Sequence, residues 1–184
     1  GKRIVFGSDY ERCLMMGDTS LERDQPQPED GLTLLYTSGT TGRAKGAVIS
    51  QRALVARAQI CWLDEIIIPG LTFVAWAPFC HIGANDSSLA TLMSGGKVVI
   101  VDGFKPAEIA DAIVENRIGW LSLAGTVGRM LSELKGRGDL RDRVRVVGSM
   151  PDLVPRSDIA DITTLLNAPF LNTFASTETG LAPA

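Results

Sequence analysis

The stretch WLSLAGTVGRMLSEL, residues Trp120–Leu134, contains the pattern that decides the fold class. It begins with a short apolar run, Trp120–Leu123, of the kind that forms a buried strand. From Val127 to Leu134 the apolar residues then follow the i, i+3, i+4, i+7 spacing of an amphipathic helix. A strand that leads directly into a helix is typical of the crossover units that build parallel sheets.

The same alternation recurs along most of the chain, which predicts an α/β fold with a largely parallel or mixed sheet. Helical stripes are expected after a cap at Ser50 (Leu54, Val55, Ala58, Cys61 and Trp62), after Pro106 (Ile109, Ala112 and Ile113) and near Pro155 (Ile159, Ile162, Leu165 and Leu166). The other expected strands are Thr33–Tyr36, Ala47–Ile49, Thr72–Ala77, Lys97–Val101, Arg145–Val147 and Phe170–Phe174.

Composition excludes several classes of protein. The 184 residues are 45% hydrophobic and 21% charged, with a formal net charge of -3, so a broad nucleic-acid-binding surface is not expected. No apolar stretch approaches the ~20 residues of a membrane span. Three scattered cysteines and one histidine fit neither a disulfide framework nor a zinc site, and a reducing cytoplasm is the expected compartment.

Ligands of open α/β sheets bind beyond the carboxyl ends of the strands, so the residues that follow each strand are candidate site residues. These segments are Thr37–Lys45, Pro78–Gly83, Gly148–Pro151 and Ser176–Glu178. Each of them contains hydroxyl groups, glycines, charged groups or the single histidine.

The first of these segments, within TSGTTGRAKG (Thr37–Gly46), concentrates glycines and hydroxyls before Lys45. Glycines allow backbone N–H groups to approach an anion, and a lysine supplies a mobile positive charge for polyphosphate. The spacing is neither that of a Walker loop nor that of a dinucleotide-binding fingerprint. Composition alone therefore leaves a phosphate loop and a plain surface loop both open.

This string resembles the T-S-G-T-T-G-x-P-K-G signature of the adenylate-forming (AMP-binding) enzymes, with Ala44 in place of the proline. Among them, the chain looks most like an acyl- or aryl-CoA synthetase. The resemblance implies that the β- and γ-phosphates of ATP are held by Thr37, Ser38, Gly39, Thr40, Thr41, Gly42 and Lys45.

A later segment, Phe174–Glu178, resembles the Y-G-x-T-E motif of the same enzymes, although its Thr-Glu pair taken alone could equally cap a helix. The resemblance implies that Phe174 stacks on adenine, that Thr177 binds the α-phosphate and that Glu178 ligates Mg²⁺. The remaining nucleotide contacts that the motifs imply are Ala175, Ser176 and the turn of Gly148, Ser149 and Met150, which is similar to the G-[AS]-x-P turn that flanks adenine.

The run from Pro78 to Gly83 resembles the P-x-F-H-x-x-G segment that borders the acyl pocket in acyl- and aryl-CoA synthetases. By this resemblance His81 either forms the pocket wall or contacts the reacting carboxylate. The segment has no acidic residue before Asp86 to pair with a substrate ammonium, which favours an acid other than an amino acid. The expected lining of the acyl pocket is His81, Ile82, Gly83 and Gly125.

The resemblance implies that residues 1–184 are the central part of a larger N-terminal AMP-binding domain. Residues 1–31 would be a leading segment and connector, and residues 32–184 the nucleotide- and acyl-binding core. The small C-terminal domain of such enzymes is absent from the sequence, so the chain alone is expected to be inactive, with exposed sheet edges that favour self-association.

The implied activity is the ATP- and Mg²⁺-dependent conversion of a small-molecule carboxylic acid to its acyl-adenylate, followed by transfer to coenzyme A. In this interpretation Lys45, Thr177, Glu178 and His81 act in catalysis. Two alternatives stay open, namely an amino-acid adenylation domain of a peptide synthetase and a non-catalytic nucleotide-binding module.

Overall fold

The centre of the molecule is a five-stranded parallel sheet, seen in a computed structural model that describes residues 7–17, 25–37, 44–64, 66–150, 152 and 154–181. Every neighbouring pair of strands in this sheet is parallel, as the alternation of strands and helices predicted. The strand order is β4 (Lys97–Ile100), β3 (Thr72–Ala75), β5 (Ile118–Ser122), β6 (Val144–Ser149) and β7 (Phe170–Asn172).

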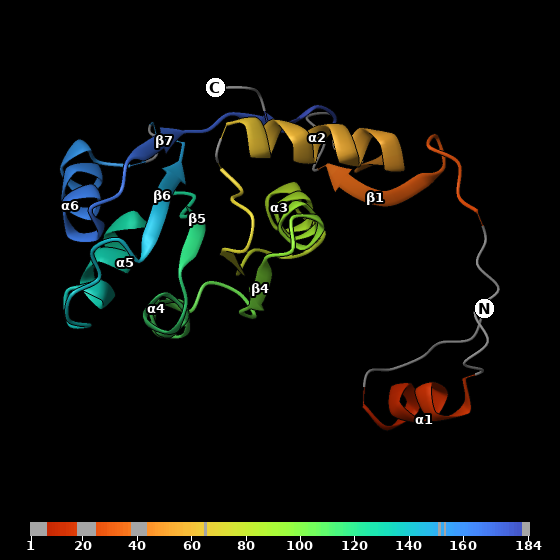
Figure 1. The fold of residues 1–184 in the computed structure, drawn as a ribbon, viewed down its shortest axis with the longest axis horizontal. Helices are drawn as coiled ribbons and strands as arrows, with labels where there is room; N and C mark the ends of the chain where they lie inside the picture. The colour runs from red at the N-terminus through yellow and green to blue at the C-terminus, as the bar shows by residue number, and fades with distance from the viewer. Residues whose placement is uncertain are drawn as a thin grey trace.

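Helices cover both faces of this sheet (Figure 1). Alternate residues of β3 point to opposite faces: Val74 packs with one group of helices, and Phe73 and Ala75 pack with the other. The first group is α4 (Pro106–Glu115), α5 (Val127–Leu134) and α6 (Arg156–Leu166), and the second is α2 (Gln51–Leu63) and α3 (Ile82–Met93).

The two strands that precede α2 do not join the central sheet. β1 (Gly31–Thr37) and β2 (Lys45–Ser50) pair with each other in an antiparallel hairpin. Leu35 and Ile49 on its inner face pack against Leu54 of α2 and Ile82 of α3. The hairpin is therefore attached to the same helix pair that covers one face of the sheet.

Local signals account for the starts of α2 and α4. Ser50 caps α2 as predicted, with its hydroxyl accepting a hydrogen bond from the backbone N–H of Ala53 at 3.2 Å. Pro106 lies in the first turn of α4, where its missing N–H is not needed. Val55, predicted on the core face of α2, is instead 39% exposed, because α2 buries a stripe through Leu54, Ala58 and Cys61.

Two helices and one small hairpin were not expected from the sequence. α1 (Ser8–Met16) has no buried residue, and α3 begins inside the segment that we interpreted as a loop. β8 (Ala175–Ser176) and β9 (Gly180–Leu181) form a short hairpin at the end of the described chain. Within the described residues, no helix combines the length and the apolarity that a membrane span requires.

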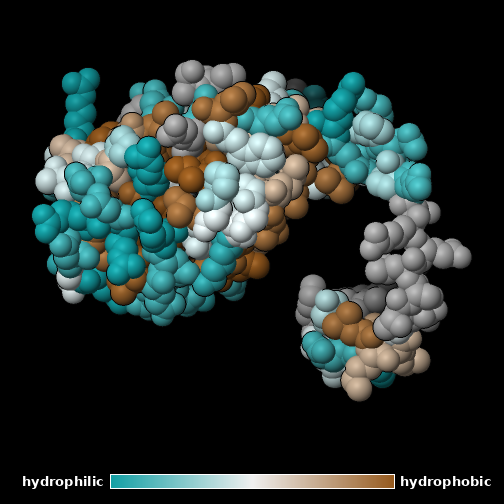
Figure 2. Space-filling view, viewed as in Figure 1, coloured by the Kyte–Doolittle hydropathy of each residue, from teal (hydrophilic) through white to brown (hydrophobic). Residues whose placement is uncertain are grey.

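The sheet ends in β4 on one side and β7 on the other, so two strand edges lie open within the described part of the chain. Ile100 on β4 is 68% exposed. Figure 2 shows exposed apolar surface between hydrophilic regions on one face of the molecule. Open edges of this kind can pair with other chains, so self-association stays a prediction.

Candidate functional site

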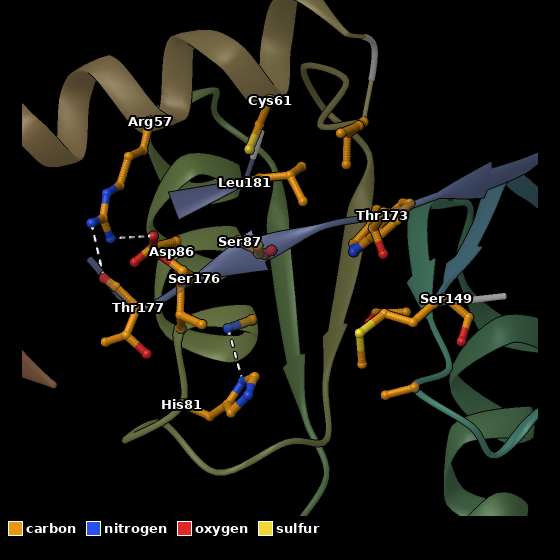
Figure 3. Close-up of a pocket in the computed structure, with 18 residues that line it drawn as sticks. Arg57, Cys61, His81, Asp86, Ser87, Ser149, Thr173, Ser176, Thr177 and Leu181 are labelled. Atoms are coloured by element: carbon orange, nitrogen blue, oxygen red, sulfur yellow. Dashed lines mark hydrogen bonds and ion pairs between the residues drawn. The ribbon is translucent and has the colours of Figure 1, made fainter. Parts of the chain in front are cut away.

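A cavity of about 320 Å³ lies at the carboxyl ends of β5 and β6, and residues of α2 and α3 contribute to its lining (Figure 3). This is the edge of the sheet at which ligands of α/β proteins bind. The β8–β9 hairpin forms one of its walls. Its lining comprises Arg57, Cys61, Ile66, His81, Ile82, Gly83, Asp86, Ser87, Trp120, Ser122, Ala124, Ser149, Met150, Thr173, Ala175, Ser176, Thr177 and Leu181.

Three buried apolar side chains contribute to the lining of the cavity. They are Cys61, Ile66 and Trp120, which we call the floor, and all three are buried in the core that α2 and α3 share with the sheet. Burial first, and then the nearby Asp86 carboxylate, together raise the pKa of the Cys61 thiol to about 11. The thiol is therefore neutral near pH 7 and acts as an apolar wall rather than as a nucleophile.

The position of Trp120 explains one of the predicted glycines. A Cβ atom on Gly148 would lie 1.7 Å from Cη2 of Trp120, so the indole ring occupies the space that a side chain would need. Gly148 is buried and does not line the cavity, whereas Ser149 and Met150 do. The Ser149 hydroxyl accepts a hydrogen bond from the backbone N–H of Gly125 at 3.3 Å. Gly125 thus supports Ser149 from outside the lining.

His81 is held at the entrance of the cavity as the N-cap of α3. Its Nδ1 accepts a hydrogen bond from the backbone N–H of Gly83 at 3.0 Å, as Figure 3 shows. Because Nδ1 is an acceptor, the neutral ring carries its proton on Nε2. Ile82 and Gly83 line the cavity beside it, so three of the four residues predicted for the acyl pocket lie together.

The predicted Thr177–Glu178 pair lies in the turn between β8 and β9. Thr177 lines the cavity, while Glu178 is exposed and lies outside the lining. Ser176 stabilises the turn, because its hydroxyl accepts a hydrogen bond from the backbone N–H of Thr179 at 3.2 Å. Ala175 also lines the cavity, whereas Phe174 is 72% exposed and does not.

The two described ends of the predicted phosphate loop are Thr37 and Lys45, which are paired across the β1–β2 hairpin. The Thr37 hydroxyl donates a hydrogen bond to the Lys45 carbonyl at 3.4 Å, and Lys45 itself is exposed. Neither residue lines the cavity, but β2 and β9 both contact α2. The loop residues Ser38, Gly39, Thr40, Thr41 and Gly42 lie outside the described residues.

Sequence reasoning missed the charged pair in the cavity wall. Arg57 and Asp86 form an ion pair at 3.0 Å between α2 and α3, and their side chains are only 7% and 11% exposed. The sequence did contain one signal for this pair. Arg57 follows Leu54 by three residues and precedes Cys61 by four, which is helical spacing. It therefore falls on the core-facing stripe of α2, where an unpaired charge is rarely buried.

The donor set of this turn fits a hard cation. Glu178 offers an exposed carboxylate and Thr177 a hydroxyl at the cavity, and oxygen ligands are those that Mg²⁺ prefers. Among the described residues, no three His, Cys, Asp or Glu side chains gather into a group that could hold a metal by themselves. Such a cation would therefore need further oxygens from a bound phosphate ligand.

The family of AMP-binding enzymes matches residues 7–183. The chain belongs to this family. It is 30% identical over 174 residues to the acyl-CoA synthetase ALT10 of Alternaria alternata, a match that covers 89% of this chain and 29% of that protein. It is 28% identical over 177 residues to the indoleacetate–CoA ligase of Aromatoleum aromaticum, covering 92% and 34%.

The fold also matches solved structures of this kind. The crystal structure of ATP-bound MatB from Rhodopseudomonas palustris superposes with a TM-score of 0.74 at 19% identity, covering 94% of this chain and 34% of that one. The chain thus spans about a third of the length of the relatives that it matches.

Proposed function

We propose that the protein carrying this chain is an AMP-forming acid–thiol ligase, which activates a carboxylic acid with ATP and transfers the acyl group to coenzyme A. One observation supports this proposal above the others. Thr177 from the nucleotide motif and His81 from the acyl motif, which are far apart in the sequence, line the same cavity at the carboxyl edge of the sheet.

In the first half-reaction, a carboxylate oxygen of the acid attacks the α-phosphorus of ATP, the bond to the β-phosphate oxygen breaks, and pyrophosphate leaves. Thr177 would bind the α-phosphate, Glu178 together with ATP oxygens would hold Mg²⁺, and Lys45 would contact the outer phosphates from the hairpin. When bound, Mg²⁺ would neutralise the negative charge that develops on the leaving pyrophosphate. His81 presents its Nε2 proton, which can orient the acid.

In the second half-reaction, the thiol sulfur of coenzyme A attacks the acyl carbonyl of the adenylate, the bond to the phosphate oxygen breaks, and AMP leaves. Residues from outside this chain would complete the surface that binds coenzyme A. We place the protein in the cytoplasm.

The substrate that this cavity favours is a compact acid with an apolar body. Cys61, Ile66 and Trp120 form the floor and offer no charged group. The negative charge of Asp86 is already paired with Arg57 through Oδ2, which argues against its use for the ammonium of an amino acid and hence against an amino-acid adenylation domain.

The decisive experiment is an ATP–pyrophosphate exchange screen of the complete natural protein that carries these residues, against short aliphatic, aromatic and amino acids. We expect exchange with aliphatic or aromatic acids, and its loss in Glu178→Ala. Glu115→Ala, an exposed glutamate on α4, is the matched control and should keep wild-type exchange. Exchange driven by amino acids would favour the peptide-synthetase alternative, and ATP binding without exchange would favour a non-catalytic module.

A further inference from the structure

The guanidinium of Arg57 connects three segments that are far apart in the sequence. Its Nη1 donates a hydrogen bond to Oδ2 of Asp86 on α3 at 3.0 Å. Its Nη2 donates to the backbone carbonyls of Thr177 at 3.0 Å and Glu178 at 2.8 Å. These are the two residues of the predicted nucleotide motif, and Arg57 holds both by the main chain, as Figure 3 shows for Thr177.

The turn is closely fitted to this side chain. Gly180 has φ +83°, and a Cβ atom there would lie 2.9 Å from both Cγ and Cδ of Arg57. A glycine at this position therefore meets two requirements, namely a left-handed backbone and room for the arginine stem. The β8–β9 hairpin contacts α2 through β9, so Arg57 lies at the junction between the helix and the turn.

Stability alone does not account for this pair. A buried ion pair is often no more stabilising than apolar residues of the same size, because both charges lose their hydration. Within the described chain, Oδ1 of Asp86 is buried and has no hydrogen-bond partner. Desolvation raises the pKa of Asp86, and the hydrogen bond and charge of Arg57 offset this only in part. The pair is thus costly to bury, and its benefit is geometric.

We propose that Arg57 is a positioning residue that fixes the Thr177–Glu178 turn against the cavity, and that Asp86 orients Arg57 for this role. The inference rests on the proposed function, since the turn would hold the α-phosphate and the cation. Arg57 donates to backbone carbonyls, so it sets the direction of the turn without using the side chains that face ATP. A planar guanidinium can make these three bonds together, whereas an ammonium group acts as a point charge.

The first test is Arg57→Lys in the complete natural protein. Removing a residue that orients a ligand-holding group typically weakens binding or activity by roughly 10- to 100-fold. We expect a loss of this size in the affinity for ATP with Mg²⁺, measured by isothermal titration calorimetry, and a matching increase in KM for ATP. The KM for the acid should change much less.

Arg137→Lys is the matched control. Arg137 also makes hydrogen bonds to two carboxylates, Asp111 and Glu133, with a side chain 29% exposed, but it does not line the cavity. This variant should have a lower thermal unfolding midpoint with unchanged affinity for ATP. A folded Arg57→Lys protein with wild-type affinity for ATP would overturn the proposal.

A double variant, Arg57→Met with Asp86→Leu, separates positioning from folding if the single variant does not fold. Replacing both charges leaves no unpaired ion, so its unfolding midpoint should stay near that of the wild type. Its affinity for ATP should still be low, and wild-type affinity would contradict the proposal. Failure of the proposed function is distinguishable, because the unaltered protein would then bind no ATP and show no exchange with any acid.

Discussion

The two segments that we expect to face the triphosphate are built in opposite ways. The Thr177–Glu178 turn is fixed by two hydrogen bonds from Arg57, a side chain only 7% exposed that also pairs with Asp86. The Thr37 and Lys45 ends of the phosphate loop lie at the tip of a two-stranded hairpin, and Lys45 is exposed. The turn is thus held in place by a buried ion pair, whereas the hairpin carries its lysine on the surface.

This difference fits the separate tasks of the two sides. In the proposed reaction the α-phosphorus is attacked, so the groups around it need to be held in place before ATP binds. The outer phosphates would leave as pyrophosphate, and a long side chain with a mobile charge can follow them. The contrast predicts that mutations on the turn side affect folding and ATP together, and that mutations on the hairpin side affect ATP alone.

The largest expected effect is that of Asp86→Ala on stability. It removes one partner of a buried pair and leaves the charge of Arg57 uncompensated, which costs about 3–5 kcal/mol in free energy of unfolding. Urea denaturation of the natural protein measures this. The matched change on the hairpin side is Glu29→Ala, which breaks an ion pair with Arg52 at 2.6 Å. Because those side chains are 64% and 71% exposed, the loss should be about 0–1 kcal/mol. Equal losses in the two variants would contradict the contrast.

A smaller effect on the free energy of unfolding is expected from a rise in pH. It acts through Cys61, which lies on α2 with Arg57. Its pKa in the folded protein is about 11, raised from 9.0 first by burial and then by Asp86. The stability that comes from the neutral thiol is fully present below about pH 9 and is lost as pH rises toward 11, because the unfolded chain ionises first. The total loss is about 2–3 kcal/mol.

Urea denaturation at several pH values tests this decline in stability. The measurements should span roughly pH 8 to 11, the range over which the thiol titrates. Cys61→Ala should remove part of the decline. Cys80→Ala, at an exposed cysteine, should leave it unchanged. A decline of the same size in all three proteins would show that Cys61 does not titrate in this way.

The sequence predicted the sheet well, because its strands are short apolar runs separated by helices with regular periodicity. All seven predicted strands exist, with ends that differ by a few residues. The sequence could not show that β1 and β2 form a hairpin separate from the central sheet, since both have the pattern of ordinary apolar strands. α3 was missed because its polar residues, Asn85 to Ser88, interrupt the apolar spacing that identifies a helix.

The sequence identified site residues that belong to motifs, but not site residues that are defined by their tertiary contacts. Residues of three motifs, represented by His81, Ser149 and Thr177, do line one cavity. Arg57 was missed because its partners are 29, 120 and 121 residues away, and no local pattern records a contact across such distances. The nucleotide contact of Gly148 stays a prediction, and the structure adds a reason for the glycine that the sequence did not show, namely room for Trp120.

The smallest expected effect on folding is that of Lys45→Ala. Lys45 is exposed at the start of β2, and surface substitutions of this kind change stability by about 0.5 kcal/mol or less. The same variant should nevertheless weaken the use of ATP, because we propose that the Lys45 ammonium group binds the outer phosphates. Urea denaturation and ATP–pyrophosphate exchange, measured on one preparation, separate the two effects. Lys97→Ala, an exposed lysine at the start of β4, is the matched control and should change neither. If Lys45→Ala leaves the KM for ATP unchanged, the hairpin does not reach the nucleotide, and the site is formed by the turn side without it.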